Sequence, residues 1–274
     1  MRLHAALGPR SAPPHARGSI AVRQGHEHGF EALVPLEESA RELLELYAPL
    51  CVGARSADMV LAHLGQSLDG RVATVTGASR FVTGPEDVRH THRLRALFDA
   101  VLVGTRTACI DNPRLTTRLV PGRQPARVIV DPNGRLDGAL GLLRDGLAPT
   151  FVVRARRTAA PRTGWGSHVE LIEVERGGDG RLPPRALLDA LAERGLRRVF
   201  IEGGGITVSR FLEAHVLDRL QIAVAPKIIG SGTPALQLAP IERMADAITA
   251  HCRCIHLGAD VLFDCILVPA DRAP

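Results

Sequence analysis

The chain has 274 residues, of which 45% are hydrophobic and 3% aromatic, and its formal net charge is +5. This length and apolar content can bury a core without metals or disulfides, and no apolar run approaches the roughly 20 residues that a membrane span needs. Four arginines precede the first acidic residue, Glu27, so the rest of the chain carries only +1 (+5 minus +4), which argues against a nucleic-acid-binding face.

The five cysteines form no C-x-x-C pair, and their odd number argues against a disulfide framework. Residues 251–256 hold a small group of metal-binding residue types, namely His251, Cys252, Cys254 and His256. Zinc is one interpretation, but the two cysteines are two residues apart, as on one face of a strand, and a second pair with zinc-site spacing is missing. We therefore expect a cytoplasmic protein without a bound metal.

Residues 1–30 are rich in Pro, Gly, Ala, Arg and His and lack apolar periodicity, which predicts a disordered tail. A transit peptide is the alternative, because the segment is rich in arginine and poor in acids. Residues 31–57 are expected to form a helical extension. Its helix is predicted from Leu36 to Leu50, ending at Pro49, with one apolar face formed by Leu36, Ala40, Leu43, Leu44 and Tyr47.

From residue 58 onward, short apolar runs alternate with helical patterns. Strands are predicted at 59–68, 100–104, 126–131, 149–153, 168–174, 197–203, 219–226 and 259–267. Helices are predicted at 86–97, after a Thr-Gly-Pro start, and at 184–194. Strands separated by helices indicate an α/β sheet that is largely parallel and covered on both faces. The last strands, which have no clear helix between them, are expected to be antiparallel.

Two strand-to-helix turns contain glycine. Gly203, Gly204 and Gly205 precede a helix that is predicted to begin near Thr207, and Gly104 precedes the residues Thr-Arg-Thr at 105–107. Glycine lets the backbone approach a ligand, and free amides at a helix start attract phosphate. Open α/β sheets bind ligands at such strand ends, so these turns predict a nucleotide crevice. A tight turn that merely needs glycine is an equal alternative.

Polar residues follow the same strands. Residues 111–118, Asp-Asn-Pro-Arg-Leu-Thr-Thr-Arg, contain two arginines that can bind phosphate or carboxylate, although ordinary surface loops have similar compositions. Glu202 ends a strand and is expected to point into the crevice, or else to cap the glycine turn. Asp69-Gly70 predicts a hairpin or tight turn.

Five segments together resemble the RibD C-terminal family, the reductase domain of the bifunctional riboflavin-biosynthesis enzymes. They are SLDGR (67–71), TGASRFVTGPEDVRHTHRLRA (76–96), VGTRTACIDNPRLTTR (103–118), FIEGGGITVSRFL (200–212) and LDRLQIAVAPKIIGSGTPAL (217–236). The resemblance implies a reductase domain over residues 58–270 with the dihydrofolate reductase-like fold, a three-layer α/β/α arrangement around a mostly parallel mixed sheet.

The resemblance also implies an activity. In that family NADPH reduces the ribosyl group of 5-amino-6-(5-phosphoribosylamino)uracil to its ribityl form: the sugar opens to an imine and C1′ accepts the hydride, so catalysis is chiefly positioning. We therefore expect an NADPH-dependent reductase of that small molecule or a close analogue, acting as a homodimer. The sequence lacks the H-A-E and P-C-x-x-C pattern of the zinc deaminase domain, so we expect no coupled deamination.

Motif matching transfers roles to individual positions. NADPH contacts are implied at Gly65, Phe81, Thr107, Asp111, Gly204, Gly205, Ile206, Thr207, Val208, Ser209 and Arg210. Substrate contacts are implied at Ser79, Arg95, Leu115, Arg118 and Glu202, with the two arginines as partners of the substrate phosphate. The catalytic candidates are Asp111, Glu202 and His63.

Three positions depart from the family pattern. His63 stands where the family usually has lysine, Phe81 where it commonly has tryptophan, and Asn112 where it has a second acid. Histidine can still donate a proton near neutral pH, although a packed strand histidine is the alternative. Two other functions stay open: reduction of another pterin-like or pyrimidine substrate, including dihydrofolate, because this fold serves both, and a non-catalytic nucleotide-binding subunit.

Overall fold

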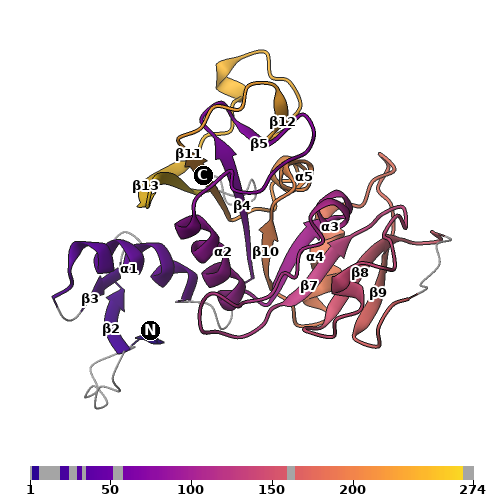
Figure 1. Ribbon diagram of the computed structural model, residues 1–274, viewed down its shortest axis with the longest axis horizontal. Coiled ribbons are helices and arrows are strands. Elements are labelled where there is room, and N and C mark those ends of the chain that lie inside the picture. Colours follow the sequence, from indigo (N-terminus) through magenta and orange to yellow (C-terminus); the bar gives the residue numbers. More distant parts are fainter. Residues whose placement is uncertain are drawn as a thin grey trace. The chain divides into compact units, whose positions relative to one another are not determined.

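The computed structural model describes residues 2–5, 19–24, 30–32, 35–51, 58–158 and 164–267. The chain divides into two compact units, Met1–Asp58 and Met59–Pro274, which are described separately (Figure 1). In the first unit, β1 (Arg2–Ala5) pairs in parallel with β2 (Ser19–Gln24), and β2 pairs antiparallel with β3 (Phe30–Ala32). The prediction of a disordered tail is therefore wrong for β1 and β2. Pairing between segments distant in sequence leaves no local periodic pattern. The other residues before β3 lie outside the described part.

The helix of the first unit, α1, runs from Glu38 to Cys51. It contains Pro49 and continues two residues beyond it, so the prediction that Pro49 ends the helix is wrong. A proline in the last turn removes only one backbone hydrogen bond, which the turn can lose. Leu44 and Tyr47 are buried, as the apolar pattern predicts, and Leu46, Ala48 and Leu50 are buried as well.

The second unit is built on a nine-stranded sheet with the order β13-β14-β11-β4-β10-β6-β7-β8-β9. Its strands are β4 (Met59–Ser67), β6 (Ala100–Gly104), β7 (Ala126–Val130), β8 (Thr150–Ala155), β9 (Val169–Val174), β10 (Arg198–Glu202), β11 (Arg219–Ala225), β13 (His251–Leu257) and β14 (Asp260–Ile266). The strands from β11 to β9 run parallel, whereas β14 is antiparallel to both of its neighbours. The predicted mixed, mostly parallel sheet with antiparallel last strands is confirmed.

Helices cover both faces of this sheet. They are α2 (Pro85–Leu97), α3 (Thr105–Asp111), α4 (Pro184–Ala192) and α5 (Gly205–Glu213), with short 3-10 turns η2 (Gly141–Leu143) and η3 (Met244–Asp246) in the loops. Leu187 of α4 and Val208 of α5 share one apolar cluster with Ile201 of β10. Phe200, the next residue along β10, points to the opposite face, where its ring centroid lies 6.0 Å from that of Phe98 at the end of α2. The three-layer prediction is confirmed.

A two-stranded ribbon lies beside the main sheet. It consists of β5 (Arg71–Thr74) and β12 (Gly232–Pro234), which are antiparallel. Asp69, in the turn between β4 and β5, accepts hydrogen bonds from the Ser67 hydroxyl and the backbone amides of Ile229 and Gly230. These hydrogen bonds, that of Ser67 first, lower the pKa of Asp69 to about 2. The predicted tight turn is present, but it connects β4 to a ribbon partnered by β12 instead of closing a hairpin.

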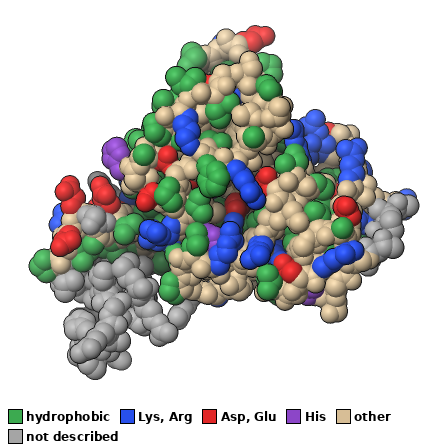
Figure 2. Space-filling view, in the orientation of Figure 1, with side chains coloured by type: hydrophobic (Ala, Val, Ile, Leu, Met, Phe, Trp, Pro, Cys, Tyr) green, Lys and Arg blue, Asp and Glu red, His purple; other side chains and the backbone are tan. Residues whose placement is uncertain are grey.

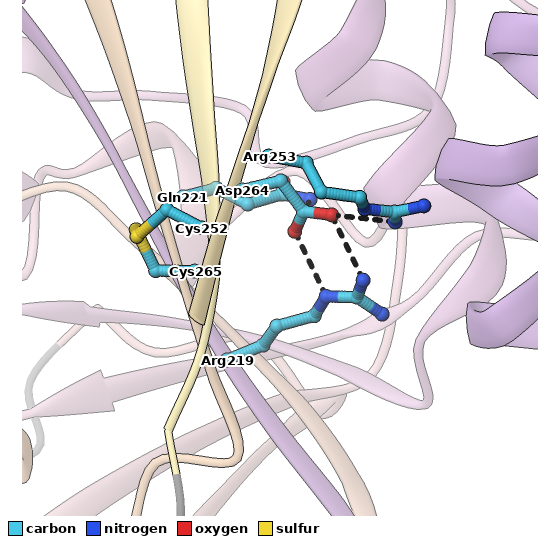
Figure 3. Close-up of a disulfide and its surroundings, with 6 residues drawn as sticks. All are labelled: Arg219, Gln221, Cys252, Arg253, Asp264 and Cys265. Carbon is cyan, nitrogen blue, oxygen red and sulfur yellow. Dashed lines mark hydrogen bonds and ion pairs between the residues drawn. A yellow bond between two sulfur atoms is a disulfide. The ribbon is translucent and has the colours of Figure 1, made fainter. Parts of the chain in front are cut away.

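One disulfide joins the two antiparallel strands at the edge of the main sheet. Cys252 of β13 and Cys265 of β14 are directly opposite each other, with Cα atoms 4.1 Å apart. The expectation that the cysteines form no disulfide is wrong for this pair, because an odd total does not prevent two cysteines from meeting through sheet register. Figure 3 shows the sulfur atoms on one side of the strands and the Asp264 carboxylate, bound by Arg219 and Arg253, on the other.

The described residues contain no group of three or more His, Cys, Asp or Glu side chains that could hold a metal ion. Their helices are also all too short or too polar to cross a membrane.

Candidate active site

A cavity of about 510 Å³ opens at the carboxyl ends of β4, β6 and β10. Its walls come from α2, from the first turns of α3 and α5, and from the β5–β12 ribbon. Figure 2 shows basic and acidic side chains close together over the middle of this face of the second unit. The strand ends of an open α/β sheet are the usual place for a ligand, and the volume suits a small molecule.

The two glycine turns at the base of the cavity fit against each other. A Cβ on Gly104, before α3, would lie 2.4 Å from Oγ1 of Thr207 in α5. A Cβ on Gly204, before α5, would lie 2.8 Å from Oγ1 of Thr107 in α3. Each glycine therefore leaves room for the threonine of the other turn. This packing brings the amides of Gly205 and Ile206, which have no intrahelical acceptor, to the cavity wall.

Backbone packing also accounts for part of this glycine run. A Cβ on Gly205 would lie 2.1 Å from the carbonyl oxygen of Ala235, closer than any side chain can approach. Gly204 has a φ of 74°, a left-handed conformation that favours glycine. The interpretation that the turn merely needs glycine therefore holds for Gly205.

Arg95 and Glu202 form a bidentate ion pair in the wall of the cavity. The Nε and Nη2 atoms of Arg95 donate to the two carboxylate oxygens of Glu202, and Nη1 donates to the carbonyl oxygen of Thr116 at 2.8 Å. All three nitrogens of this buried guanidinium are thus engaged. Arg118 also lines the cavity, and its exposed guanidinium has no partner among the residues that the structure describes. Arg118 is therefore better placed than Arg95 to meet an anion.

His63 points from β4 toward α2, where its Nε2 donates to Oδ1 of Asp87 at 2.9 Å. Only 4% of the histidine and 3% of the aspartate are exposed, so the pair is largely withdrawn from water. Burial by itself lowers the pKa of His63, but the charge of Asp87 and this hydrogen bond outweigh it, and the pKa is raised. His63 is therefore a buried strand residue that is bonded to Asp87 and lines the cavity, with a pKa raised above its ordinary value.

His63 is one member of a polar row that crosses five adjacent strands. In register the row reads Glu202, His63, Gln221, Asp264 and Arg253. Gln221 donates to Asp264 at 3.0 Å, and Arg253 donates to the same carboxylate at 3.0 Å. Buried polar groups are tolerable only when they are bonded in this way. The row places His63 and Glu202 side by side, and each bonds to a residue of α2, His63 to Asp87 and Glu202 to Arg95.

His90 of α2 connects the helix to this row. Its Nε2 donates to Oε1 of Gln221 at 2.8 Å, and its ring centroid lies 5.5 Å from that of His63. Burial, reinforced by the nearby His63, lowers the pKa of His90 to about 4. Of the two neighbouring histidines, His63 therefore holds the proton and His90 is neutral.

Asp111 and Ser79 meet on the opposite wall of the cavity. The Ser79 hydroxyl donates to Oδ1 of Asp111 at 3.4 Å, and burial is the main cause that raises the pKa of this aspartate. The next residue, Asn112, adopts a left-handed conformation with a φ of 39° and accepts a hydrogen bond from the Gly141 amide at 2.9 Å. Asparagine suits a left-handed helix end, so this departure from the family pattern has a structural role.

The structure brings most of the sequence-predicted site residues into one cavity. Those that line it are His63, Gly65, Ser79, Arg95, Thr107, Asp111, Arg118, Glu202, Gly204, Gly205, Ile206, Thr207 and Arg210. The side chains of Phe81, Leu115, Val208 and Ser209 do not. Leu115 and Val208 are buried in the core, Ser209 accepts a hydrogen bond from the Gln237 amide at 2.8 Å, and Phe81 is 82% exposed outside the cavity.

Sequence reasoning missed the polar side of α2. Asp87, Thr91 and His92 line the cavity together with the predicted Arg95. Asp87, Thr91 and Arg95 are spaced at four-residue intervals, which places them on one face of a helix. A polar stripe on a helix that covers a buried sheet is a signal that could have revealed them.

Comparison with known proteins identifies the family of this chain. The RibD C-terminal domain matches residues 58–260. The chain is 34% identical over 212 residues to the 2,5-diamino-6-ribosylamino-4(3H)-pyrimidinone 5′-phosphate reductase of Methanothermobacter thermautotrophicus, covering 75% of this chain and 96% of that protein. It is 33% identical to the riboflavin biosynthesis protein RibD of Aquifex aeolicus, covering 72% of this chain but only 53% of that protein.

Solved structures agree with this similarity. The chain matches a crystal structure from Thermotoga maritima, titled as a diaminohydroxyphosphoribosylaminopyrimidine deaminase/5-amino-6-(5-phosphoribosylamino)uracil reductase, with a TM-score of 0.65 and 25% identity over 84% of this chain and 62% of that one. A Saccharomyces riboflavin biosynthesis reductase, at 22% identity, has the same fold with a TM-score of 0.66 over 82% of this chain and 99% of that one. This chain belongs to the RibD C-terminal domain family of reductases.

Proposed function

We propose that this protein is an NADPH-dependent reductase that converts the ribosyl group of a 5-phosphoribosylamino-pyrimidine to its ribityl form. The observation that carries the proposal is a single cavity with the amides of Gly205 and Ile206 in one wall and the exposed guanidinium of Arg118 in another. A dinucleotide and a sugar phosphate each need such an anion-binding group. Relatives of this chain are named as reductases of this kind of substrate.

The residues of the two glycine turns fit a nicotinamide cofactor. Gly204, Gly205 and Ile206 line the cavity, and the amides of Gly205 and Ile206 lack intrahelical acceptors. We propose that these amides hold the pyrophosphate, with Thr107 and Arg210 adding polar contacts from the same wall. NADPH bound there supplies the hydride. The contribution of the protein is to fix its orientation and to exclude water.

At the substrate end, Arg118 is proposed to bind the phosphate, while Glu202 and Ser79 contact the sugar and the pyrimidine. Opening the sugar breaks the C1′–O4′ bond, with O4′ gaining a proton and the nitrogen losing one, and leaves a double bond between C1′ and nitrogen. The hydride then adds to C1′, and a proton is needed on the nitrogen. His63, kept protonated by Asp87, is the proposed source of positive charge and of this proton.

The test supplies purified protein with NADPH and, in separate reactions, 2,5-diamino-6-ribosylamino-4(3H)-pyrimidinone 5′-phosphate and 5-amino-6-(5-phosphoribosylamino)uracil. We expect cofactor oxidation that matches the formation of a ribityl product heavier by two hydrogens, as seen by mass spectrometry. The pyrimidinone is expected to react faster, because a relative that the chain covers almost completely is named for it. NADPH binding without reduction of either pyrimidine would refute the proposed substrate.

The two alternatives are separated in the same assay. A dihydrofolate reductase would oxidise NADPH with dihydrofolate and would be inhibited by an antifolate. A non-catalytic nucleotide-binding subunit would bind NADPH tightly and turn over none of the three substrates. The combination of Ser79, Arg118 and Glu202 around one cavity favours a phosphorylated, polar substrate over either alternative.

A homodimer is also proposed. Strand β13 is the outermost strand of the main sheet, and most of its residues are exposed. An exposed edge strand readily pairs with a second copy of the same chain. Light scattering during size-exclusion chromatography should give twice the mass of one chain, and a monomer at all concentrations would contradict it.

A further inference from the structure

The loop that carries Arg118 is fixed by three side chains at three successive residues. Arg95 donates to the carbonyl oxygen of Thr116, as described above. Gln124 accepts from the amide of Thr117 at 2.8 Å and donates to its carbonyl oxygen at 2.7 Å. The amide of Arg118 itself donates to Nδ1 of His92 at 3.0 Å. The backbone is thus held rigidly while the Arg118 guanidinium is left for a ligand.

This bond defines the state of His92. Because Nδ1 accepts a hydrogen from a backbone amide, it carries no proton, and the ring is neutral with its hydrogen on Nε2. Burial, followed by the charges of Arg95 and Arg118, lowers the pKa of His92 to about 4. The acceptor therefore persists through the whole neutral pH range.

His92 is a costly choice if stability alone is considered. Only 1% of the residue is exposed, and its Nε2 atom is buried without a hydrogen-bond partner among the described residues. A buried donor left in this way is destabilising, because it has lost its hydrogen bonds to water. An apolar side chain would avoid that cost but would leave the Arg118 amide without its acceptor. What the histidine adds is therefore the position of Arg118.

We propose that His92 is a positioning residue for Arg118 and that it sets the affinity for the phosphate of the substrate without touching the substrate itself. The inference rests on the proposed function, in which Arg118 binds that phosphate. Pre-organising a binding group reduces the ordering cost of binding, so releasing the Arg118 backbone weakens affinity even though the guanidinium is unchanged.

The test compares His92→Leu with His92→Asn. Leucine removes the acceptor, whereas the Oδ1 atom of asparagine can stand where Nδ1 stands and accept from the same amide. We expect His92→Leu to weaken binding of ribose 5-phosphate, measured by calorimetry, and to raise KM for the phosphorylated pyrimidine, each about tenfold, which corresponds to about 1.4 kcal/mol. His92→Asn should keep ribose 5-phosphate affinity and KM close to those of the wild type. The affinity for NADPH should be unchanged in both variants.

A double-mutant cycle tests whether His92 acts through Arg118. In an Arg118→Ala background, His92→Leu should have no further effect on ribose 5-phosphate binding. The inference is overturned if the tenfold loss persists in that background, if His92→Asn is as weak as His92→Leu, or if the wild type fails to bind ribose 5-phosphate. If His92→Leu does not fold, His92→Gln replaces it in the test. The amide of glutamine reaches the position of Nε2 and not that of Nδ1, so this variant also lacks the acceptor for the Arg118 amide. Absence of reductase activity in the wild type would refute the proposed function, while the binding comparison would still decide this inference.

Discussion

The Nε2 atom of His63 lies 2.9 Å from Oδ1 of Asp87, and this pair occupies the position at which related reductases are expected to carry a lysine. Burial opposes the charge on His63, but Asp87 outweighs burial and raises the pKa of the histidine above 6.5. Burial likewise opposes the charge on Asp87, and His63 outweighs it, lowering the pKa of the aspartate below 3.8. Each member of the pair thus favours the charged form of the other.

The first prediction concerns stability against pH. The folded-state pKa of His63 is raised, so its contribution to the stability of the fold is complete below its unfolded pKa and is lost as the pH rises through the folded pKa. The folded-state pKa of Asp87 is lowered, so its contribution to stability is lost as the pH falls through that lowered pKa. The free energy of unfolding by urea should therefore decrease as the pH rises above about 6.5, and Asp87→Asn should abolish this decrease. The exposed His215→Gln is the matched control. If the free energy of unfolding of Asp87→Asn depends on pH in the same way as that of the wild type, the prediction is wrong.

The second prediction concerns the ion pair between Arg95 and Glu202. Glu202→Gln leaves the Arg95 guanidinium buried without its charge partner, so we expect a loss of about 3 kcal/mol in the free energy of unfolding by urea. The double variant Arg95→Leu, Glu202→Leu should be more stable than Glu202→Gln, since it leaves no unpaired charge. If the losses in unfolding free energy of the single leucine variants at Arg95 and Glu202 add up to that of the double variant, the two side chains do not act as a pair.

The third prediction separates backbone strain from packing in the glycine turn. Alanine at Gly203 or Gly204 is strained in both cases, since the φ values are 69° and 74°. Only at Gly204 does the added Cβ also approach Oγ1 of Thr107, at 2.8 Å, whereas nothing lies within 4 Å of a Cβ at Gly203. Gly204→Ala should weaken NADPH binding at least about tenfold more than Gly203→Ala in a fluorescence titration, a difference of about 1.4 kcal/mol. Equal losses would mean that strain alone is responsible.

The fourth prediction concerns the anion-binding end of the cavity. Arg118→Ala should raise KM for the phosphorylated pyrimidine by about 10- to 100-fold, because a hydrogen bond to a charged group contributes about 1.5–3 kcal/mol. The KM for NADPH should not change. Arg114→Ala removes an exposed arginine of the same loop that does not line the cavity, and it should behave like the wild type. With the dephosphorylated substrate, Arg118→Ala and Arg114→Ala should have the same KM in steady-state assays.

Much of the fold was predictable because it depends on local patterns. Buried parallel strands are short apolar runs, and their alternation with helices fixes the layers. Features formed by distant segments were not predictable in the same way: the β5–β12 ribbon, the Cys252–Cys265 bridge and the first sheet all depend on pairing that no local window contains. Helix α3 was missed because it has only seven residues and begins with Thr-Arg-Thr, which reads as a turn.

The site was predictable where residues sit at strand ends, because the carboxyl ends of parallel strands share one edge of the sheet. The run from Gly204 to Arg210 shows the limit of this reasoning. A helix turns about 100° per residue, so consecutive residues cannot all face one ligand, and Val208 and Ser209 point into the core. The bond between His63 and Asp87, which are 24 positions apart, depends on the placement of α2 over the sheet and was invisible to motif matching.

The close fit of Gly104 with Thr207 and of Gly204 with Thr107 has an evolutionary consequence. A larger residue at either glycine is compatible only with loss of the facing threonine side chain, so single substitutions at these positions are selected against and paired ones are tolerated. Among homologues, positions 104 and 207 should therefore vary together, whereas position 204 should stay glycine because its φ of 74° strains any side chain.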